Sequence, residues 1–165
     1  MATTSLRGNP VQTVGELPVV GDQAPAYTLT GSDLGDVTSA GLAGSRVVLN
    51  IFPSLDTATC AQSVRRFNEL ASSLDRTVVV CASADLPFAA KRFCATEGLQ
   101  NVVTGSAFRS SFGTDYGVTM TDGAMRGLLA RSVVVVDADG TVLHTQLVPD
   151  IGTEPDYDAA VAALG

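Results

Sequence analysis

The sequence predicts an α/β fold in which a mixed central sheet is flanked by helices. Nearly continuous apolar, β-branched segments alternate with helical patterns, as expected of parallel strands that are covered on both faces. Two further strand patterns near the C-terminus flank the turn residues 138–140, a strong hairpin signal. The 165 residues, 45% of them hydrophobic, suit one domain. We therefore expect a single domain over 1–165, with an N-terminal β-hairpin at about 3–15 and a core at about 18–165.

The individual elements are predicted from local patterns. Gly8-Asn9 separates two short strand-like segments and predicts the hairpin. The order of the later elements indicates a mixed sheet with helices on both faces. The first half comprises a strand at 46–52, a helix whose buried stripe is Cys60, Val64, Phe67, Ala71 and Leu74, and a strand at 77–82. Asp85-Leu-Pro87 then introduces a second helix, which runs to about Glu97 and stops at Gly98. The second half comprises a strand near 101–104, a short helix around Phe108, strands at 132–137 and 141–147, and a helix at about 155–164.

Charge and hydropathy exclude several classes of partner. The net charge of -7 and the pI near 4.4 oppose binding to nucleic acid, which requires clustered Lys and Arg. No apolar run approaches the roughly 20 residues that span a bilayer, and no secretory leader is visible. We expect a soluble protein without a membrane partner.

The cysteines indicate the compartment. Cys60, Cys81 and Cys94 cannot all pair within one chain, so a reduced, cytoplasmic location is expected. A single histidine, His144, and the lack of a Cys-x-x-Cys pair leave little to bind zinc. No metal or cofactor is expected.

Cys60 is the candidate nucleophile. A thiol reacts as its thiolate, and Cys60 lies in the predicted first turn of a helix, where free N–H groups and the helix dipole favour negative charge. Thr57 can cap that helix or bind the sulfur, and Pro53 fixes the entering chain. Ionisation alone adds at most about 30-fold to the rate, since an ordinary thiol is already a few per cent ionised at pH 7. If the substrate is a peroxide, donors around the O–O bond must supply the larger part.

A family resemblance makes this chemistry specific. The pattern Pro-x-x-x-Thr-x-x-Cys at 53–60 resembles the active-site loop of peroxiredoxins. The stretch 50–57, with Phe93-Cys-Ala-Thr-Glu-Gly98 and Asn101-Val102, resembles the thiol peroxidase branch, the atypical two-cysteine peroxiredoxins. The likeness runs from about Val14 to the C-terminal helix and implies a thioredoxin-like fold.

The resemblance also implies site residues and partners. Cys60 would be the peroxidatic cysteine, Cys94 the resolving cysteine, and Arg131 the arginine that contacts thiolate and peroxide. The substrates would be hydroperoxides, with a leaning toward alkyl hydroperoxides. An intramolecular disulfide reduced by thioredoxin and a homodimer are further family properties. One departure is Ala58, where the family commonly has proline.

The two cysteines impose a geometric demand. They lie on consecutive predicted helices, and a disulfide requires Cα atoms within about 4.4 to 6.8 Å. If the packed helices hold them further apart, local unfolding must follow oxidation of Cys60 to a sulfenic acid.

Other readings remain beside this one. Cys81, inside an apolar strand, is interpreted as core packing. A redox sensor or holdase would use the same oxidation without turnover. A disulfide oxidoreductase normally needs a Cys-x-x-Cys pair, and a hydrolase that pairs Cys60 with His144 has little support in the sequence.

Overall fold

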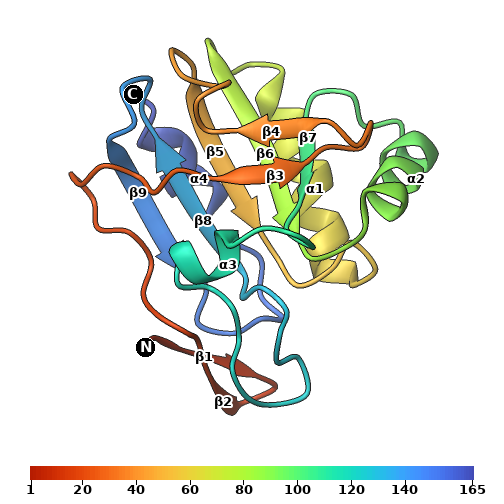
Figure 1. Cartoon of the computed structure of the whole chain (residues 1–165), viewed down its shortest axis with the longest axis vertical. Coiled ribbons are helices and arrows are strands. Elements are labelled where there is room, and N and C mark those ends of the chain that lie inside the picture. The colour runs from red at the N-terminus through yellow and green to blue at the C-terminus, as the bar shows by residue number, and fades with distance from the viewer.

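The computed structural model describes residues 1–165 and contains a seven-stranded mixed sheet with a separate two-stranded hairpin (Figure 1). The elements are β1 (Thr3–Leu6), β2 (Asn9–Gln12), β3 (Thr28–Thr30), β4 (Asp36–Thr38), β5 (Arg46–Ile51), α1 (Ala58–Ala71), β6 (Thr77–Ser83), α2 (Pro87–Glu97), β7 (Val103–Ser106), α3 (Phe112–Asp115), β8 (Ser132–Val136), β9 (Val142–Leu147) and α4 (Tyr157–Ala162).

The large sheet has the order β4-β3-β7-β6-β5-β8-β9. The three central strands β5, β6 and β7 are parallel, and β8, β9, β3 and β4 join them antiparallel. The predicted mixed sheet is therefore confirmed. Strands β3 and β4, at one end of the sheet, escaped prediction because each has three residues, too few to show a period.

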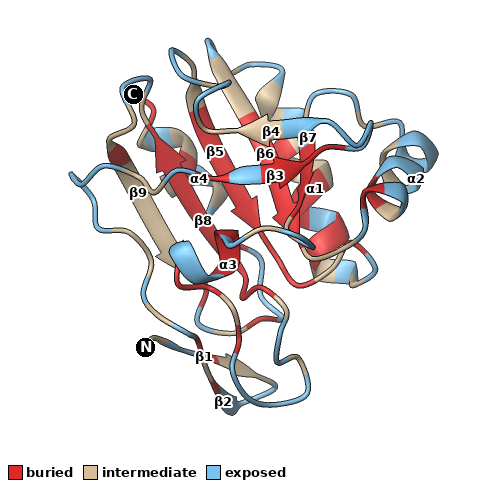
Figure 2. Ribbon diagram, viewed as in Figure 1, coloured by how far each residue is buried: buried red, intermediate tan, exposed pale blue.

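Two hydrophobic layers cover the sheet. Successive strand residues point to opposite faces, so Val48 packs with α1, α2 and α4, while its neighbour Leu49 packs with Tyr27 and α3 on the other face. Figure 1 shows α3 in front of the sheet and α1 and α4 behind it, and Figure 2 shows that β5, β6 and β8 are the most buried strands. Helices on both faces are confirmed, although one face carries only the single turn of α3.

The N-terminal hairpin is confirmed, with its turn one residue earlier than predicted. Arg7 and Gly8 form the two-residue loop, with φ of 52° and 82°. Positive φ at both positions is the turn geometry that matches the twist of two paired strands. The hairpin attaches to the later chain because the Thr4 hydroxyl donates to the Val148 carbonyl at 2.8 Å.

Some predicted bounds shift in the structure. Helix α1 ends before Leu74, and β7 begins two residues later than expected. The short helix expected around Phe108 is α3, four residues further on, while Phe108 itself is exposed in the preceding turn. Helix α4 is shorter than predicted. Helix α2 begins at Pro87 and is capped by Gly98 with φ of 67°, as the sequence predicts.

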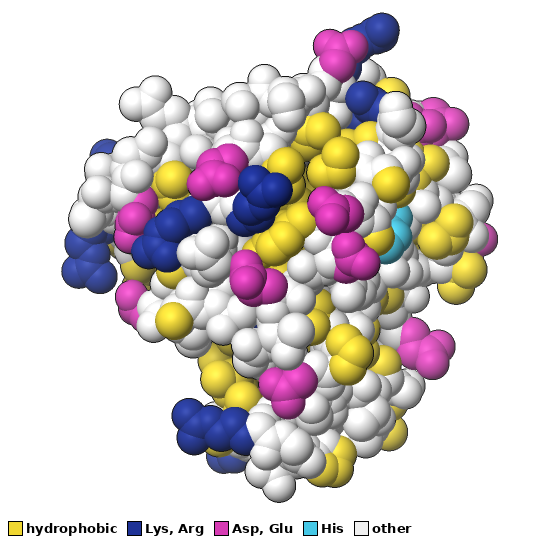
Figure 3. Space-filling view, turned by 180° about the vertical axis from the view of Figure 1, so that it is seen from behind, with side chains coloured by type: hydrophobic (Ala, Val, Ile, Leu, Met, Phe, Trp, Pro, Cys, Tyr) yellow, Lys and Arg dark blue, Asp and Glu magenta, His cyan; other side chains and the backbone are white.

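The surface carries no helix that is long and apolar enough to cross a membrane. Figure 3 shows the face that lies at the back of Figure 1, where basic and acidic side chains are interspersed with apolar ones.

Cys81 lies on β6 in the layer that faces α1, and its predicted burial is confirmed. Burial raises the pKa of the Cys81 thiol to about 12; the hydrogen bond from Asn50 opposes this rise, and the charge of Cys94 adds to it. The thiol therefore stays protonated in the folded chain well above neutral pH.

This protonation makes stability depend on pH. Below pH about 8.5 the thiol is protonated in both states, but above that value the unfolded chain releases the proton and the folded chain retains it until about 12. The free energy of unfolding should thus fall by up to about 1.4 kcal/mol per pH unit in this window. Urea unfolding at pH 8, 9 and 10 should show a shallower decline for Cys81→Ala than for wild type. Parallel declines would contradict the prediction.

Candidate active site

The loop between β5 and α1 positions Cys60. Strand β5 is buried in the sheet and delivers the chain to Pro53, itself buried. Thr57 has an extended backbone and is the N-cap of α1; its Oγ1 accepts from the Cys60 N–H at 3.3 Å and its hydroxyl donates to the Ser54 carbonyl. The predicted cap is confirmed. Ala58 is the first helical residue, a position that accepts proline or alanine without change of backbone.

The Cys60 sulfur lies in the protein interior against a buried guanidinium. Cys60 is fully buried, and Arg131 Nη2 donates to its Sγ at 3.1 Å. The Arg131 side chain, 1% exposed, is the largest fully buried side chain in the chain. A cation in contact with sulfur away from solvent stabilises the thiolate much more strongly than it would in water.

The guanidinium is fixed in place and retains bonding capacity. Arg131 precedes β8, and its Nε donates to the Ile151 carbonyl at 2.9 Å. Its Nη1 is buried without a partner. Because buried N–H groups are nearly always paired, this one is suited to receive an oxygen atom that arrives beside Cys60. An arginine at a strand start would ordinarily lie in solvent, so its burial is a finding of the structure.

The segment 148–152 holds both the arginine and the helix start. The Ile151 N–H donates to the Ser5 carbonyl of β1 at 2.8 Å, while its own carbonyl accepts from Arg131. The Thr59 hydroxyl donates to the Gly152 carbonyl at 3.2 Å. The N-terminal hairpin thus supports the segment that orients Arg131.

A buried polar chain lies beneath the first turn of α1, and sequence reasoning missed it. Asn50 Nδ2 donates to Ser63 Oγ at 3.2 Å, and the Ser63 hydroxyl donates to the Cys60 carbonyl at 2.7 Å. Asn50 is fully buried, and its Oδ1 has no partner. The available signal was an asparagine inside an otherwise apolar strand.

Asp85 was predicted only as part of a helix start. In the structure its carboxylate accepts from Ser54 Oγ and from the Leu55 N–H, both at 2.8 Å. It therefore joins the loop that carries Thr57 and Cys60 to the start of α2. No local pattern around Asp85 indicates that its carboxylate points to that loop.

Cys94 is not brought to Cys60. It lies on α2, half-buried, and both cysteines are free. Burial raises the pKa of the Cys94 thiol. Hydrogen bonds therefore join Cys60 to Thr57 and to Arg131, Pro53 begins the loop that leads to them, and Cys94, on α2, forms no disulfide with Cys60.

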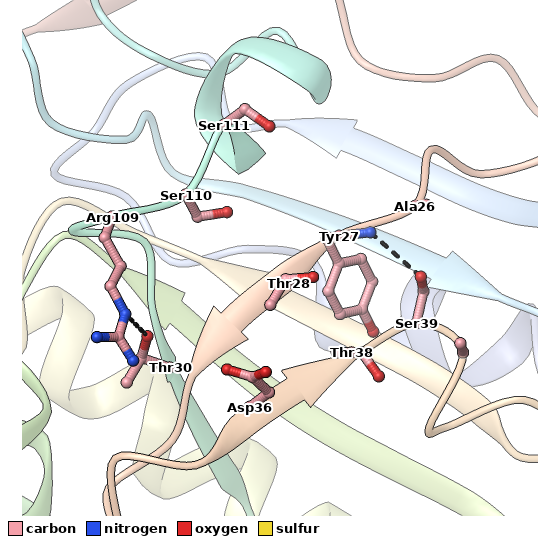
Figure 4. A pocket seen from close by; sticks show the side chains of 11 residues that line it. Ala26, Tyr27, Thr28, Thr30, Asp36, Thr38, Ser39, Arg109, Ser110 and Ser111 are labelled. Atoms are coloured by element: carbon pink, nitrogen blue, oxygen red, sulfur yellow. Dashed lines mark hydrogen bonds between the residues drawn. The ribbon is translucent and has the colours of Figure 1, made fainter.

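The larger surface hollows lie elsewhere. Figure 4 shows one of about 540 Å³ between β3, β4 and the residues 109–111, where the Tyr27 N–H donates to Ser39 Oγ and Arg109 Nε donates to Thr30 Oγ1. It contains none of the predicted site residues. No hydrogen bond joins His144 to Cys60, and His144 Nε2 is buried without a partner. No cluster of three His, Cys, Asp or Glu side chains is arranged to hold a metal.

Comparison with known proteins identifies the family. The Redoxin family model matches residues 19–161. The thiol peroxidase of Mycobacterium tuberculosis is 61% identical over 165 residues, which is 100% of this chain and 99% of the relative. The thiol peroxidase of Corynebacterium glutamicum is 56% identical over 99% of both chains.

A solved structure agrees with these relatives. The crystal structure of a peroxiredoxin-like protein from Aquifex aeolicus superimposes with a TM-score of 0.94 at 40% identity, covering 99% of this chain and 96% of the other. The thioredoxin-like fold implied by the sequence resemblance is therefore confirmed. The chain belongs to the Redoxin family, within its thiol peroxidase branch.

Proposed function

We propose that this chain is a thiol peroxidase that reduces hydrogen peroxide and organic hydroperoxides through Cys60. The observation that carries the proposal is the 3.1 Å contact between Arg131 Nη2 and the buried Cys60 sulfur, at a capped helix start. The thiolate attacks one peroxide oxygen, the O–O bond breaks, and sulfur is oxidised to a sulfenic acid. The departing oxygen takes a proton and leaves as water or alcohol.

Each site residue has a distinct role in this step. The unpartnered Nη1 of Arg131 would bind the peroxide and stabilise the negative charge that develops on the departing oxygen. Thr57 fixes the first turn through its cap, in which its Oγ1 accepts from the Cys60 N–H. Pro53 excludes water from one side of the loop. Arg131 would thus serve both the thiolate and the transition state.

The cycle closes through Cys94. Its thiol attacks the sulfenic sulfur of Cys60, an S–S bond forms and the sulfenic oxygen leaves as water. Since the two cysteines lie on separate helices and are free, the first turn of α1 or the end of α2 must open. A thioredoxin dithiol would then reduce the disulfide. The odd number of cysteines supports work in the reducing cytoplasm.

Stopped-flow peroxide consumption with hydrogen peroxide and cumene hydroperoxide tests this function. Wild type with a thioredoxin system should turn over, and Cys60→Ser should fall to the background rate because no other thiol is placed beside Arg131. Cys94→Ser should consume one equivalent of peroxide and form no intramolecular disulfide. Equal rates for wild type and Cys60→Ser would overturn the proposal, and a single oxidation of wild type without turnover would identify a sensor.

The arginine is tested by a substitution that preserves packing. Methionine has a similar length without charge, so Arg131→Met removes the buried charge and keeps apolar packing in its place. Arg131→Met should therefore fold, as circular dichroism can verify, while oxidation of Cys60 slows by about a hundredfold or more. Arg131→Lys keeps the charge but not the planar fork, so it should also be slow. A wild-type oxidation rate in Arg131→Met would exclude the assigned role.

We also propose that the chain forms a homodimer through the surface that follows the carboxyl ends of β6 and β7. The large apolar side chains Leu86, Phe88 and Phe108 are exposed there, and the Ala107 N–H donates to the Ser83 carbonyl, which places Phe108 beside the start of α2. Grouped exposed apolar residues favour an interface.

Sedimentation equilibrium tests the dimer. Phe88→Glu should sediment as a monomer because a charge cannot be buried unpaired in an apolar interface. Val19→Glu, at another exposed apolar position, should leave the dimer intact. A monomeric wild type would refute the proposal.

A further inference from the structure

Asp85 stands between the two elements that the catalytic cycle must bring together. It follows β6 and precedes α2, the helix that carries Cys94, yet its carboxylate turns away from α2 toward the loop that carries Cys60. Oδ1 accepts from Ser54 Oγ at 2.8 Å, and Oδ2 accepts from the Leu55 N–H at 2.8 Å and from Ser83 Oγ at 2.7 Å. Hydrogen bonds to a carboxylate are the stronger kind.

Asp85 is itself held firmly on the sheet. Its N–H donates to Ser83 Oγ at 3.3 Å, and its carbonyl accepts from the Ser106 hydroxyl, so the residue is anchored to the ends of both β6 and β7. The carboxylate is thus a fixed point, and the loop is the part that can move relative to it.

On the side that faces α2, Leu55 is buried in the apolar layer, but the packing beside it is incomplete. A cavity of about 150 Å³ separates Leu55 and Asp56 from the residues of α2, and its walls include Phe93 and Glu97. Close packing is therefore interrupted between the loop and α2. The two bonds from Ser54 and Leu55 to Asp85 cross this gap at its edge, where the carboxylate also lines the cavity.

We propose that Asp85 is a positioning residue that holds residues 54–57 in the conformation in which Cys60 faces Arg131. This inference rests on the proposed peroxidase function. While the two bonds persist, the capped first turn of α1 is maintained and Cys60 reacts with peroxide. When they break, the loop is released and the oxidised Cys60 leaves its helix to meet Cys94. The same carboxylate therefore favours the first chemical step and retards the second.

Rapid-quench alkylation with mass spectrometry separates the two steps, since it counts thiol, sulfenic acid and disulfide at each time. Asp85→Ala should oxidise Cys60 about tenfold more slowly and form the Cys60–Cys94 disulfide about tenfold faster, as expected from the loss of charge-assisted hydrogen bonds. Asp85→Asn retains one acceptor oxygen, so both rates should lie between those of wild type and Asp85→Ala. A smaller fraction of folded protein would slow both steps, and equal urea midpoints for wild type and Asp85→Asn would show that the opposite changes do not come from a general loss of stability.

Asp56→Asn is the matched control. Asp56 is an exposed carboxylate in the same loop whose side chain makes no hydrogen bond, so its substitution removes an equal charge without removing a tether. It should leave both rates at the wild-type values. If Asp56→Asn reproduces the effect of Asp85→Asn, charge rather than tethering is responsible and the proposal is wrong.

Further measurements keep the test decisive. Should Asp85→Ala fail to fold, Ser54→Ala removes one of the same bonds from the other side and should shift both rates in the same directions.

Hydrogen exchange tests the tether directly. In the reduced wild type, the Leu55 amide should exchange its proton more slowly than the Asp56 amide, which bonds only within the loop. Unchanged rates in Asp85→Ala, or equal slowing of both steps, would overturn the role of Asp85. A wild type that forms no Cys60–Cys94 disulfide would instead overturn the proposed function.

Discussion

The contact between the Arg131 guanidinium and the Cys60 sulfur is the interaction on which the rest of the site depends. Arginine stays charged at any working pH, and a buried charge is costly unless it is paired. Arg131 has only the Ile151 carbonyl and the Cys60 sulfur as partners. The burial of Arg131 and the placement of the Cys60 sulfur beside it are therefore two aspects of one constraint.

Meeting that constraint requires segments that are distant in the sequence. Strand β5 and α1 supply the sulfur, the residue before β8 supplies the arginine, and the segment 148–152 supplies the carbonyl that orients it. The hairpin β1–β2 lies outside the large sheet, yet the Ser5 carbonyl binds the Ile151 N–H. Its contribution to the site is thus indirect but specific, because it fixes the peptide that accepts from Arg131.

A feature of the fold or the site can be predicted from the sequence when residues close to it in the chain determine it. The Pro53 to Cys60 loop, the Thr57 cap and the ends of α2 depend on neighbours in the chain, so the sequence predicts them. The burial of Arg131 depends on contacts 20 and 71 residues away, and only the family resemblance pointed to it. Asp85 and Asn50 act through side chains that cross between elements, which no periodicity records. Strands β3 and β4 and the position of α3 were missed because elements of three or four residues are too short to show a periodic pattern.

The proposed opening at Cys60 must leave the rest of the chain folded, and the contacts that hold α1 differ from its first turn to the next. Besides the buried Cys60 side chain, the first turn is held by polar links, namely the Thr57 cap, the bond from Thr59 to Gly152 and the Asp85 tether of the preceding loop. Such links exchange for bonds to water at small net cost. One turn later, Val64 and Phe67 are fully buried in the apolar layer, and exposing them forfeits a hydrophobic contribution of about 1.5 to 3 kcal/mol each. The bond from Ser63 to the Cys60 carbonyl lies at this boundary. In the proposed cycle, opening would therefore stop one turn into α1, which would free Cys60 and leave the rest of α1 on the sheet.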